Sequence, residues 1–255
     1  MCIHFVVDGH HKLIRWGFVV HAGIDGYSRL ITYMCCATDN RANTVYRLFV
    51  TAVEQYGLPS RLGCDQGREN VRVAEHMILY RGADRGSVMV GSSVHNQRIE
   101  RLWRDMHRCV TSVYYHLFYY MEQNGLLNPI DTNHLFALQY VYLPRINQSL
   151  EVFCDGWNNH RLRSEHHQTP LQLFTAGVIN QAMFASDDIH DFSSYGIVED
   201  GLVAATGTAD EEGVHVPQLT LTDAQTTYLL STVNPLADSD TYGMDLYQQT
   251  LDIIL

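Results

Sequence analysis

The stretch Leu62-Gly63-Cys64-Asp65-Gln66-Gly67-Arg68-Glu69-Asn70 places a carboxylate directly after a short apolar segment. A second short apolar run, Ile3-His4-Phe5-Val6-Val7, also ends on a carboxylate, Asp8. Such runs are typical of buried strands, so both acids are expected at strand ends. A third acid, Glu100, lies in a helical pattern 35 residues after Asp65. Carboxylates grouped in this way are hard oxygen ligands that suit Mg²⁺ or Mn²⁺.

These residues resemble the integrase core domain shared by retroviral and retrotransposon integrases and by many DDE transposases. In that family the first acid ends strand one, the second lies in a Ser-Asp-x-Gly-x-Glu-Asn/Phe motif, and the third follows about 35 residues later on a helix. The chain matches this order, with Cys64 in place of the usual serine. Two further segments are similar to the Tyr-Asn-x-x-Arg…Thr-Pro signature that closes many integrase cores: Trp157-Asn158-Asn159-His160-Arg161 and Thr169-Pro170-Leu171. The chain also resembles animal integrase-core proteins related to Ginger-type DNA transposons.

The resemblance implies an α/β, RNase H-like fold with a mixed five-stranded sheet flanked by helices and an additional C-terminal helical part. It also implies that Asp8, Asp65 and Glu100 are catalytic and hold two Mg²⁺ or Mn²⁺ ions. DNA would be the substrate: water frees a 3′-hydroxyl, which then attacks a target strand. Members of this family work as multimers, so a homo-oligomer is expected, and the nucleus is the expected location.

The local patterns predict an order of elements compatible with that fold. Strands are expected over 3–8, 15–24, 29–37, 62–65 and 87–90, and helices over 41–56 and 69–80. Asp25-Gly26 is a turn signal, so the second and third strands are expected to form a hairpin.

Around the Glu100 helix, apolar and polar residues separate onto two sides. Plotted at about 100° per residue, the apolar side carries Ile99, Leu102, Trp103, Met106, Cys109 and Val110. Glu100 falls on the polar side, either facing an active-site cleft or pairing with Arg104 four residues on. The residues expected to contact DNA are Asn96, Arg98, Arg101, Arg104, Arg108 and Arg161.

Two other acids near the motifs have alternative roles. Asp25 follows an apolar strand in an Asp-Gly-Tyr-Ser-Arg context that is structural in integrases, with replacement of Asp8 as a minor alternative. Glu69 follows Asp65 by four residues at the expected start of a helix. It is interpreted as a helix N-terminal charge, or as a group that contacts the metal ligands without binding the metal itself.

Residues 111–150 are rich in aromatic side chains: Tyr114, Tyr115, Phe118, Tyr119, Tyr120, Phe136, Tyr140 and Tyr142. Their helical spacing favours a core or a subunit interface. Stacking of nucleic-acid bases is the alternative.

Charge divides the chain into two parts. Residues 1–176 contain all 17 basic residues and 15 acidic ones, a formal charge of +2, whereas residues 177–255 contain 13 acidic residues and no basic one, a charge of −13. We therefore expect a catalytic core over 1–176 and an acidic, largely disordered tail over 177–255. One short helix is expected in that tail, where Thr222-Asp223-Ala224-Gln225 forms a capping box. The tail is expected to recruit a protein partner or to fold back on the arginines.

Composition also limits the class of protein. The chain has no apolar run of 18 residues, so no membrane span is expected. Its start lacks the pattern of a signal peptide and lies almost on the first strand, which suggests a shortened N-terminus. The six cysteines form no Cys-x-x-Cys pair, which favours a reduced, intracellular protein.

Three functions therefore remain open. The leading hypothesis is a metal-dependent DDE polynucleotidyl transferase that cuts and joins DNA. The alternative is a domesticated, non-catalytic DNA-binding or protein-interaction module that keeps the fold. A hydrolytic nuclease that cuts without joining is a third possibility.

Overall fold

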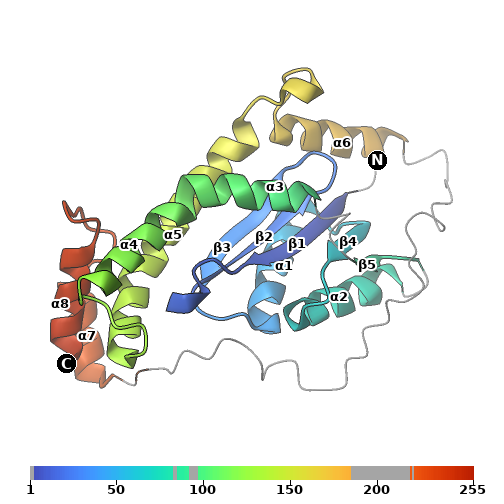
Figure 1. The fold of residues 1–255 in the computed structure, drawn as a ribbon. Helices are drawn as coiled ribbons and strands as arrows, with labels where there is room; N and C mark the ends of the chain where they lie inside the picture. Colours follow the sequence, from blue (N-terminus) through green and yellow to red (C-terminus); the bar gives the residue numbers. More distant parts are fainter. Residues whose placement is uncertain (1–2, 83–84, 92–96, 185–218, 220) are drawn as a thin grey trace.

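A five-stranded mixed sheet forms the centre of the computed structural model, which describes residues 3–82, 85–91, 97–184, 219 and 221–255. The strand order is β3-β2-β1-β4-β5, and helices cover both faces of the sheet (Figure 1). Antiparallel pairing joins β1 (His4–His10), β2 (Val19–Asp25) and β3 (Ile31–Ala37). Parallel pairing joins β1 to β4 (Arg61–Cys64) and β4 to β5 (Val88–Val90). This is the expected RNase H-like arrangement. Residues 15 and 16, expected at the start of the second strand, belong to the 3₁₀ turn η1 (Ile14–Trp16) instead.

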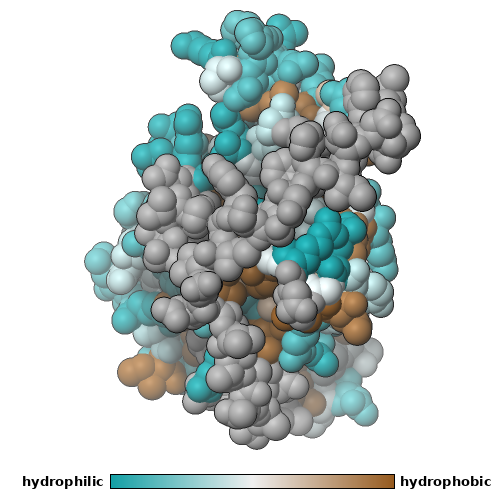
Figure 2. Space-filling model, turned by 90° about the vertical axis from the view of Figure 1, so that its right-hand side faces the viewer, coloured by the Kyte–Doolittle hydropathy of each residue, from teal (hydrophilic) through white to brown (hydrophobic). Residues whose placement is uncertain are grey.

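The alternation of side chains along β1 separates the two hydrophobic cores. Phe5 and Val7 pack on one face with α1 (Ala42–Tyr56) and α2 (Val71–Arg81), which follows the 3₁₀ turn η2 (Arg68–Asn70). Val6 points to the opposite face and the larger core. The outer side of α2 leaves Ile78 and Leu79 exposed. On this side of the molecule, Figure 2 shows hydrophobic surface in separate patches among hydrophilic residues.

A π-helical turn interrupts the long helix that covers the larger core. The helix consists of α3 (Gln97–Met106), the π-turn η3 (His107–Thr111) and α4 (Ser112–Gln123). Cys109 is exposed, while Val110 and Thr111 are buried. The prediction that Cys109 lies on the apolar side is therefore wrong. A plot at a constant angle per residue fails there because a π-turn contains about one extra residue.

Helix α5 (Thr132–Asn159) covers the outer edge of β3 and satisfies its backbone with two asparagine side chains. The Asn147 amide accepts a hydrogen bond from Cys36 N (2.8 Å) and donates one to Cys36 O (3.1 Å). Asn158 does the same for Ile31, at 2.9 Å and 3.1 Å. The two asparagines are 11 residues apart, about 16 Å of helical rise, which matches about 17 Å for the five-residue step along β3. The edge of β3 is thereby closed to other strands.

The C-terminal part differs from the tail that the composition predicts. Beyond η4 (Arg163–Glu165), α6 (Pro170–Phe184) continues past the expected boundary at 176. Residues 185–218 and 220 lie outside the described residues. The expected capping box is present at the start of α7 (Asp223–Thr232), and a further helix, α8 (Met244–Ile254), follows.

Helices α7 and α8 pack on α4 and α5, at the end away from β4 and β5 (Figure 1). Their buried residues are Leu229, Val233, Leu246, Tyr247, Thr250, Leu251 and Ile254. Tyr247 Oη donates to Leu126 O (3.0 Å), and Arg145 Nη2 donates to Ala237 O (2.5 Å). The expectation of a largely disordered tail therefore does not describe residues 221–255. The acidic composition of this segment concealed an apolar face with helical spacing.

Candidate functional site

Strand pairing brings Asp8 and Asp65 to equivalent positions on neighbouring parallel strands. The pairing aligns His4 with Arg61 and ends at Val6 and Gly63; Asp8 and Asp65 each lie two residues beyond that last pair, and Asp65 directly follows β4. Because side chains alternate along a strand, Asp8 points to the same face as Val6, and Asp65 to the same face as Gly63. Both carboxylates therefore lie on the α3 side of the sheet. The expectation that Asp8 ends its strand is wrong, because β1 continues through Gly9 and His10, which pair with β2, whereas Asp65 directly follows β4.

Asp8 is half-buried and is held by two hydrogen bonds. Its Oδ2 accepts from the Trp103 indole Nε1 at 2.8 Å, and its Oδ1 accepts from Gly9 N at 2.8 Å. Burial raises the pKa of the Asp8 carboxyl above its usual value, and the charge of Asp65 raises it further, while the two hydrogen bonds oppose the rise. The bond from Trp103 also fixes α3 against β1.

Asp65 is exposed, and two residues of the motif that follows it, Gly67 and Asn70, fix the orientation of its carboxylate. Its Oδ1 accepts hydrogen bonds from Gly67 N (3.1 Å) and from the side-chain nitrogen of buried Asn70 (2.8 Å). Cys64 points into the core, where burial raises the pKa of its thiol to about 12. The cysteine that replaces the usual serine is therefore an uncharged core residue.

Glu69 lies closer to the aspartate pair than its sequence position suggested. Burial raises the pKa of its carboxyl, and the charges of Asp65 and Asp8 raise it further. The carboxylate folds back over Gly67, where a Cβ would overlap Glu69 Oε1 and Oε2. The sequence signal for this fold-back is a glycine two residues before the glutamate, since only glycine leaves the space free.

Glu100 does not join the pair directly in this structure. It is exposed on α3 and makes no hydrogen bond or ion pair among the described residues, so the alternative pairing with Arg104 is absent. Within the described ranges, no group of three or more His, Cys, Asp or Glu side chains is close enough to hold a metal ion. Trp103 lies three residues from Glu100, a neighbouring position on the helix surface, so Glu100 is about one turn from the residue that bonds Asp8.

The arginines predicted to contact DNA lie on exposed surface. Arg98 donates to Tyr27 O at 3.3 Å, and Arg101, Arg104, Arg108 and Arg161 are exposed. Asn96 lies outside the described residues. Helix α3 thus carries three exposed arginines, Arg98, Arg101 and Arg104, and Trp103 fixes this helix beside Asp8.

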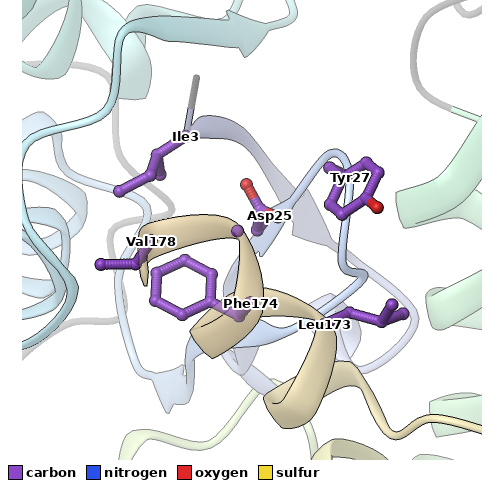
Figure 3. Close-up of a pocket in the computed structure, with 7 residues that line it drawn as sticks. Ile3, Asp25, Tyr27, Leu173, Phe174 and Val178 are labelled. Atoms are coloured by element: carbon purple, nitrogen blue, oxygen red, sulfur yellow. The ribbon is translucent and has the colours of Figure 1, made fainter. Parts of the chain in front are cut away.

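Asp25 has the structural role that its sequence context indicates. Its Oδ2 accepts from Ser28 N (2.8 Å) and Ser28 Oγ (2.7 Å), and its Oδ1 accepts from His4 N (3.1 Å). It lies at the base of a small pocket between the start of β1 and α6, which Ile3, Tyr27 and Phe174 also line (Figure 3). Asp25 is therefore a turn residue and does not replace Asp8.

Comparisons with known proteins identify the family of this chain. A family model described as "Integrase core domain" matches residues 3–187. The chain is similar to the catalytic core domain of BIV integrase, with 15% identity over 71% of this chain and 99% of that chain and a TM-score of 0.48. It is also similar to the HTLV-2 integrase catalytic core domain in complex with magnesium, in a trimeric form. The identity is 12% over 68% of this chain and 95% of that chain, and the TM-score is 0.43. The chain is similar as well to the simian T-cell lymphotropic virus intasome in complex with the PP2A regulatory subunit B56 gamma. The identity is 13% over 68% of this chain and 54% of that chain, and the TM-score is 0.43.

A search of curated proteins finds no match. Among the described helices, none combines the length and the apolar character needed to cross a membrane.

Proposed function

Because the chain belongs to the integrase core domain family, and so to the polynucleotidyl transferase superfamily, we propose that it cuts and joins DNA phosphodiesters at Asp8, Asp65 and Glu100. The observation that carries the proposal is the position of Asp8 and Asp65, each two residues beyond the last β1–β4 pair, with Asp8 bonded to Trp103 of α3. Two unrelated surface acids would not be expected at matching positions near adjacent strands, on the face of the sheet covered by a helix that carries a third carboxylate.

The residues present fit a divalent metal. Asp8 and Asp65 provide hard oxygen donors, and the burial that raises the pKa of Asp8 is a cost that a nearby cation would offset. Asp8, Asp65 and Glu100 would hold Mg²⁺ or Mn²⁺. When bound, such ions would help to deprotonate the attacking water or hydroxyl and would stabilise the leaving oxygen.

The other side chains of the site orient these carboxylates and the substrate. Trp103 holds Asp8 through its indole N–H, and Asn70 holds Asp65 through its amide. Arg101, Arg104 and Arg108 would bind phosphates on either side of the scissile bond, where guanidinium groups can form paired hydrogen bonds. In this scheme the protein contributes mainly positioning and charge neutralisation.

A non-catalytic DNA-binding or protein-interaction module is the second candidate. It is favoured by the position of Glu100, which is exposed and outside any three-residue metal cluster of the described chain. In that case the arginines of α3 would bind DNA without cleavage.

For its partners, we propose DNA and a second copy of this chain. A protein partner for the acidic segment and a nuclear location are further proposals. The version in which the tail folds back on the arginines does not suit residues 221–255, because α7 and α8 pack at the other end of the molecule (Figure 1).

A nicking and strand-transfer assay on supercoiled plasmid with Mn²⁺ or Mg²⁺ tests the proposal. We expect metal-dependent nicking in the wild-type protein and a loss of at least about 100-fold in Glu100→Gln. Glu54→Gln is the matched control, because Glu54 is also an exposed glutamate on a helix, α1. Activity in neither protein, with both folded by circular dichroism, would favour the binding module instead. Joined products would distinguish a transferase from a nuclease.

A further inference from the structure

A continuous series of ring contacts leads away from Asp8 along the long helix. It starts at Trp103, whose indole bonds Asp8, and the centroid of the His10 ring lies 5.3 Å from that of Trp103. His107 follows at 5.9 Å from His10, then Tyr115 at 6.5 Å from His107, and Tyr119 at 4.7 Å from Tyr115. We call these five residues the aromatic tract.

The π-turn η3 brings the two halves of the aromatic tract onto one side of the helix. Around an uninterrupted α-helix, Trp103 and Tyr115 would lie about 120° apart. The π-turn acts as about one extra residue and reduces that angle to about 20°. His107 lies in the turn itself, where its Nδ1 is 2.9 Å from Thr111 Oγ1. Turns of this kind are frequent at functional sites, and this one aligns Tyr115 with the residue that bonds Asp8.

The aromatic tract is partly open to solvent and is flanked by basic side chains. Trp103 is buried, whereas His10, His107, Tyr115 and Tyr119 are half-buried. Exposed neighbours are His11, Lys12, Arg15 and His116. The Arg15 guanidinium lies 5.9 Å from the centre of the Tyr119 ring and is paired with Glu122 at 2.7 Å.

Lys12 lies beside the start of the aromatic tract. It is exposed and follows His10, a half-buried member of the tract, by two residues. Lys12 is also the single lysine of the 255-residue chain, which makes it a specific chemical marker for this surface.

We propose that the aromatic tract binds an unpaired DNA strand next to the catalytic site, with its rings against the bases and with Lys12 near the phosphates. The proposal rests on the proposed function for the choice of DNA as ligand. Unpaired bases are favoured over a duplex because a ring can stack only on a base face, and faces in a duplex are covered by neighbouring bases. The rim charges suit a phosphate backbone.

Packing explains only part of this arrangement. Trp16 is fully buried and contacts Tyr115 and Tyr119 edge-on, at 5.7 Å and 5.1 Å, so one side of each tyrosine belongs to the core. Core packing gives no reason for a series of half-exposed rings that begins at Asp8 and is flanked by Lys12 and Arg15. A strand-binding surface accounts for both features.

Fluorescence anisotropy in EDTA measures the first consequence, with the full chain and two labelled DNAs, a blunt duplex and the same duplex with a single-stranded overhang. We expect Tyr115→Ala and Tyr119→Ala to weaken binding of the overhang DNA by at least about fivefold and binding of the blunt duplex by less than about twofold. Tyr115→Phe should bind like the wild type, because it keeps the ring. Tyr120→Ala is the matched control, since Tyr120 lies on the same helix, is 52% exposed and is not part of the tract. Equal losses on both DNAs, or no loss, would contradict the proposal.

A cross-linking experiment locates the strand without relying on core-facing tyrosines. An abasic site carries an aldehyde that condenses with a primary amine and loses water, and cyanoborohydride reduces the resulting imine to a stable amine. We expect a higher cross-linking yield with the abasic site in the overhang than within the duplex. Lys12→Arg should reduce that yield to the level given by the N-terminal amine. A yield that does not depend on Lys12, or that is equal for both positions, would overturn the assignment.

The two proposals fail in different ways. Overhang binding that depends on the aromatic tract, in a protein without nicking activity, would retain the strand-binding surface and reject the transferase. Nicking that depends on Glu100, with no effect of the tract variants on overhang binding, would reject the surface and retain the transferase.

Discussion

Asp8 and Asp65 are positioned by the sheet, whereas Glu100 is positioned by a single helix. The two aspartates each lie two residues beyond the last β1–β4 pair, and each has a hydrogen-bond donor that fixes its carboxylate, Trp103 for Asp8 and Asn70 for Asp65. Glu100 is exposed and has no such donor among the described residues. Two of the three proposed ligands are thus pre-organised, and the third has a free carboxylate.

Because the two aspartates are oriented and Glu100 is not, metal binding and catalysis should depend on different residues. A site with two oriented carboxylates can bind a divalent ion weakly before DNA arrives. Glu100, on the helix that carries the arginines, would then act once α3 is engaged with the substrate. The comparison therefore predicts different consequences for the loss of an aspartate and the loss of the glutamate.

The largest expected effect comes from the aspartate pair. We expect Asp65→Asn to weaken Mn²⁺ binding in the absence of DNA by at least about tenfold, because affinity follows the number of charged ligands. Glu100→Gln should change the same binding by less than about threefold, although both variants lose nicking activity. Isothermal titration calorimetry with Mn²⁺ measures the difference. Equal loss of Mn²⁺ binding in the two variants would show that Glu100 is as firmly placed as the aspartates.

A second, smaller effect tests whether the sheet alone positions the aspartates. Asn158→Ala would leave the backbone N–H and C=O of Ile31 without their partners at the far edge of the sheet. We expect a loss of about 1–3 kcal/mol in the free energy of unfolding, from urea denaturation, with Mn²⁺ affinity unchanged. Asn159→Ala is the matched control, because its side chain bonds only Asp155 O within the helix, and it should cost less than about 0.5 kcal/mol. Weaker Mn²⁺ binding in the folded Asn158→Ala protein would mean that the edge and the site are coupled.

The sequence predicted the sheet-borne half of the site better than the helix-borne half. Apolar runs ending on Asp8 and Asp65 are local signals, and strand alternation carries both acids to one face without further information. The fold-back of Glu69 over Gly67 is a local contact that hydrophobic periodicity does not report, and the π-turn at His107 breaks the constant angle per residue on which the helical plot depends. Helix α8 was missed for a related reason: its apolar face has meaning only against α5, and the acidic composition of the segment outweighed it.

The smallest expected effect concerns the far end of the helix that carries Glu100. Glu122 accepts hydrogen bonds from Arg15 Nη2 (2.7 Å) and Trp16 Nε1 (2.6 Å), which hold the end of α4 to the segment after β1. Its pKa is lowered mainly by the bond from Arg15 and also by the bond from Trp16. A carboxyl whose pKa is lower in the folded state contributes stability above its unfolded value of 4.5, and this contribution is lost as the pH falls through the folded value.

We therefore expect Glu122→Gln to be less stable than the wild type at pH 7, by less than Asn158→Ala because the Arg15 pair is screened by solvent. The difference should disappear as the pH is lowered below 4.5, and urea denaturation at several pH values measures it. Nicking activity at pH 7 should stay within about twofold of the wild type, because the bond between Trp103 and Asp8 still fixes α3 beside β1. A large loss of activity would mean that the position of Glu100 depends on the contacts of the whole helix from α3 to α4. Glu100 would then be positioned as firmly as the aspartates, although its carboxylate accepts no hydrogen bond from the described residues.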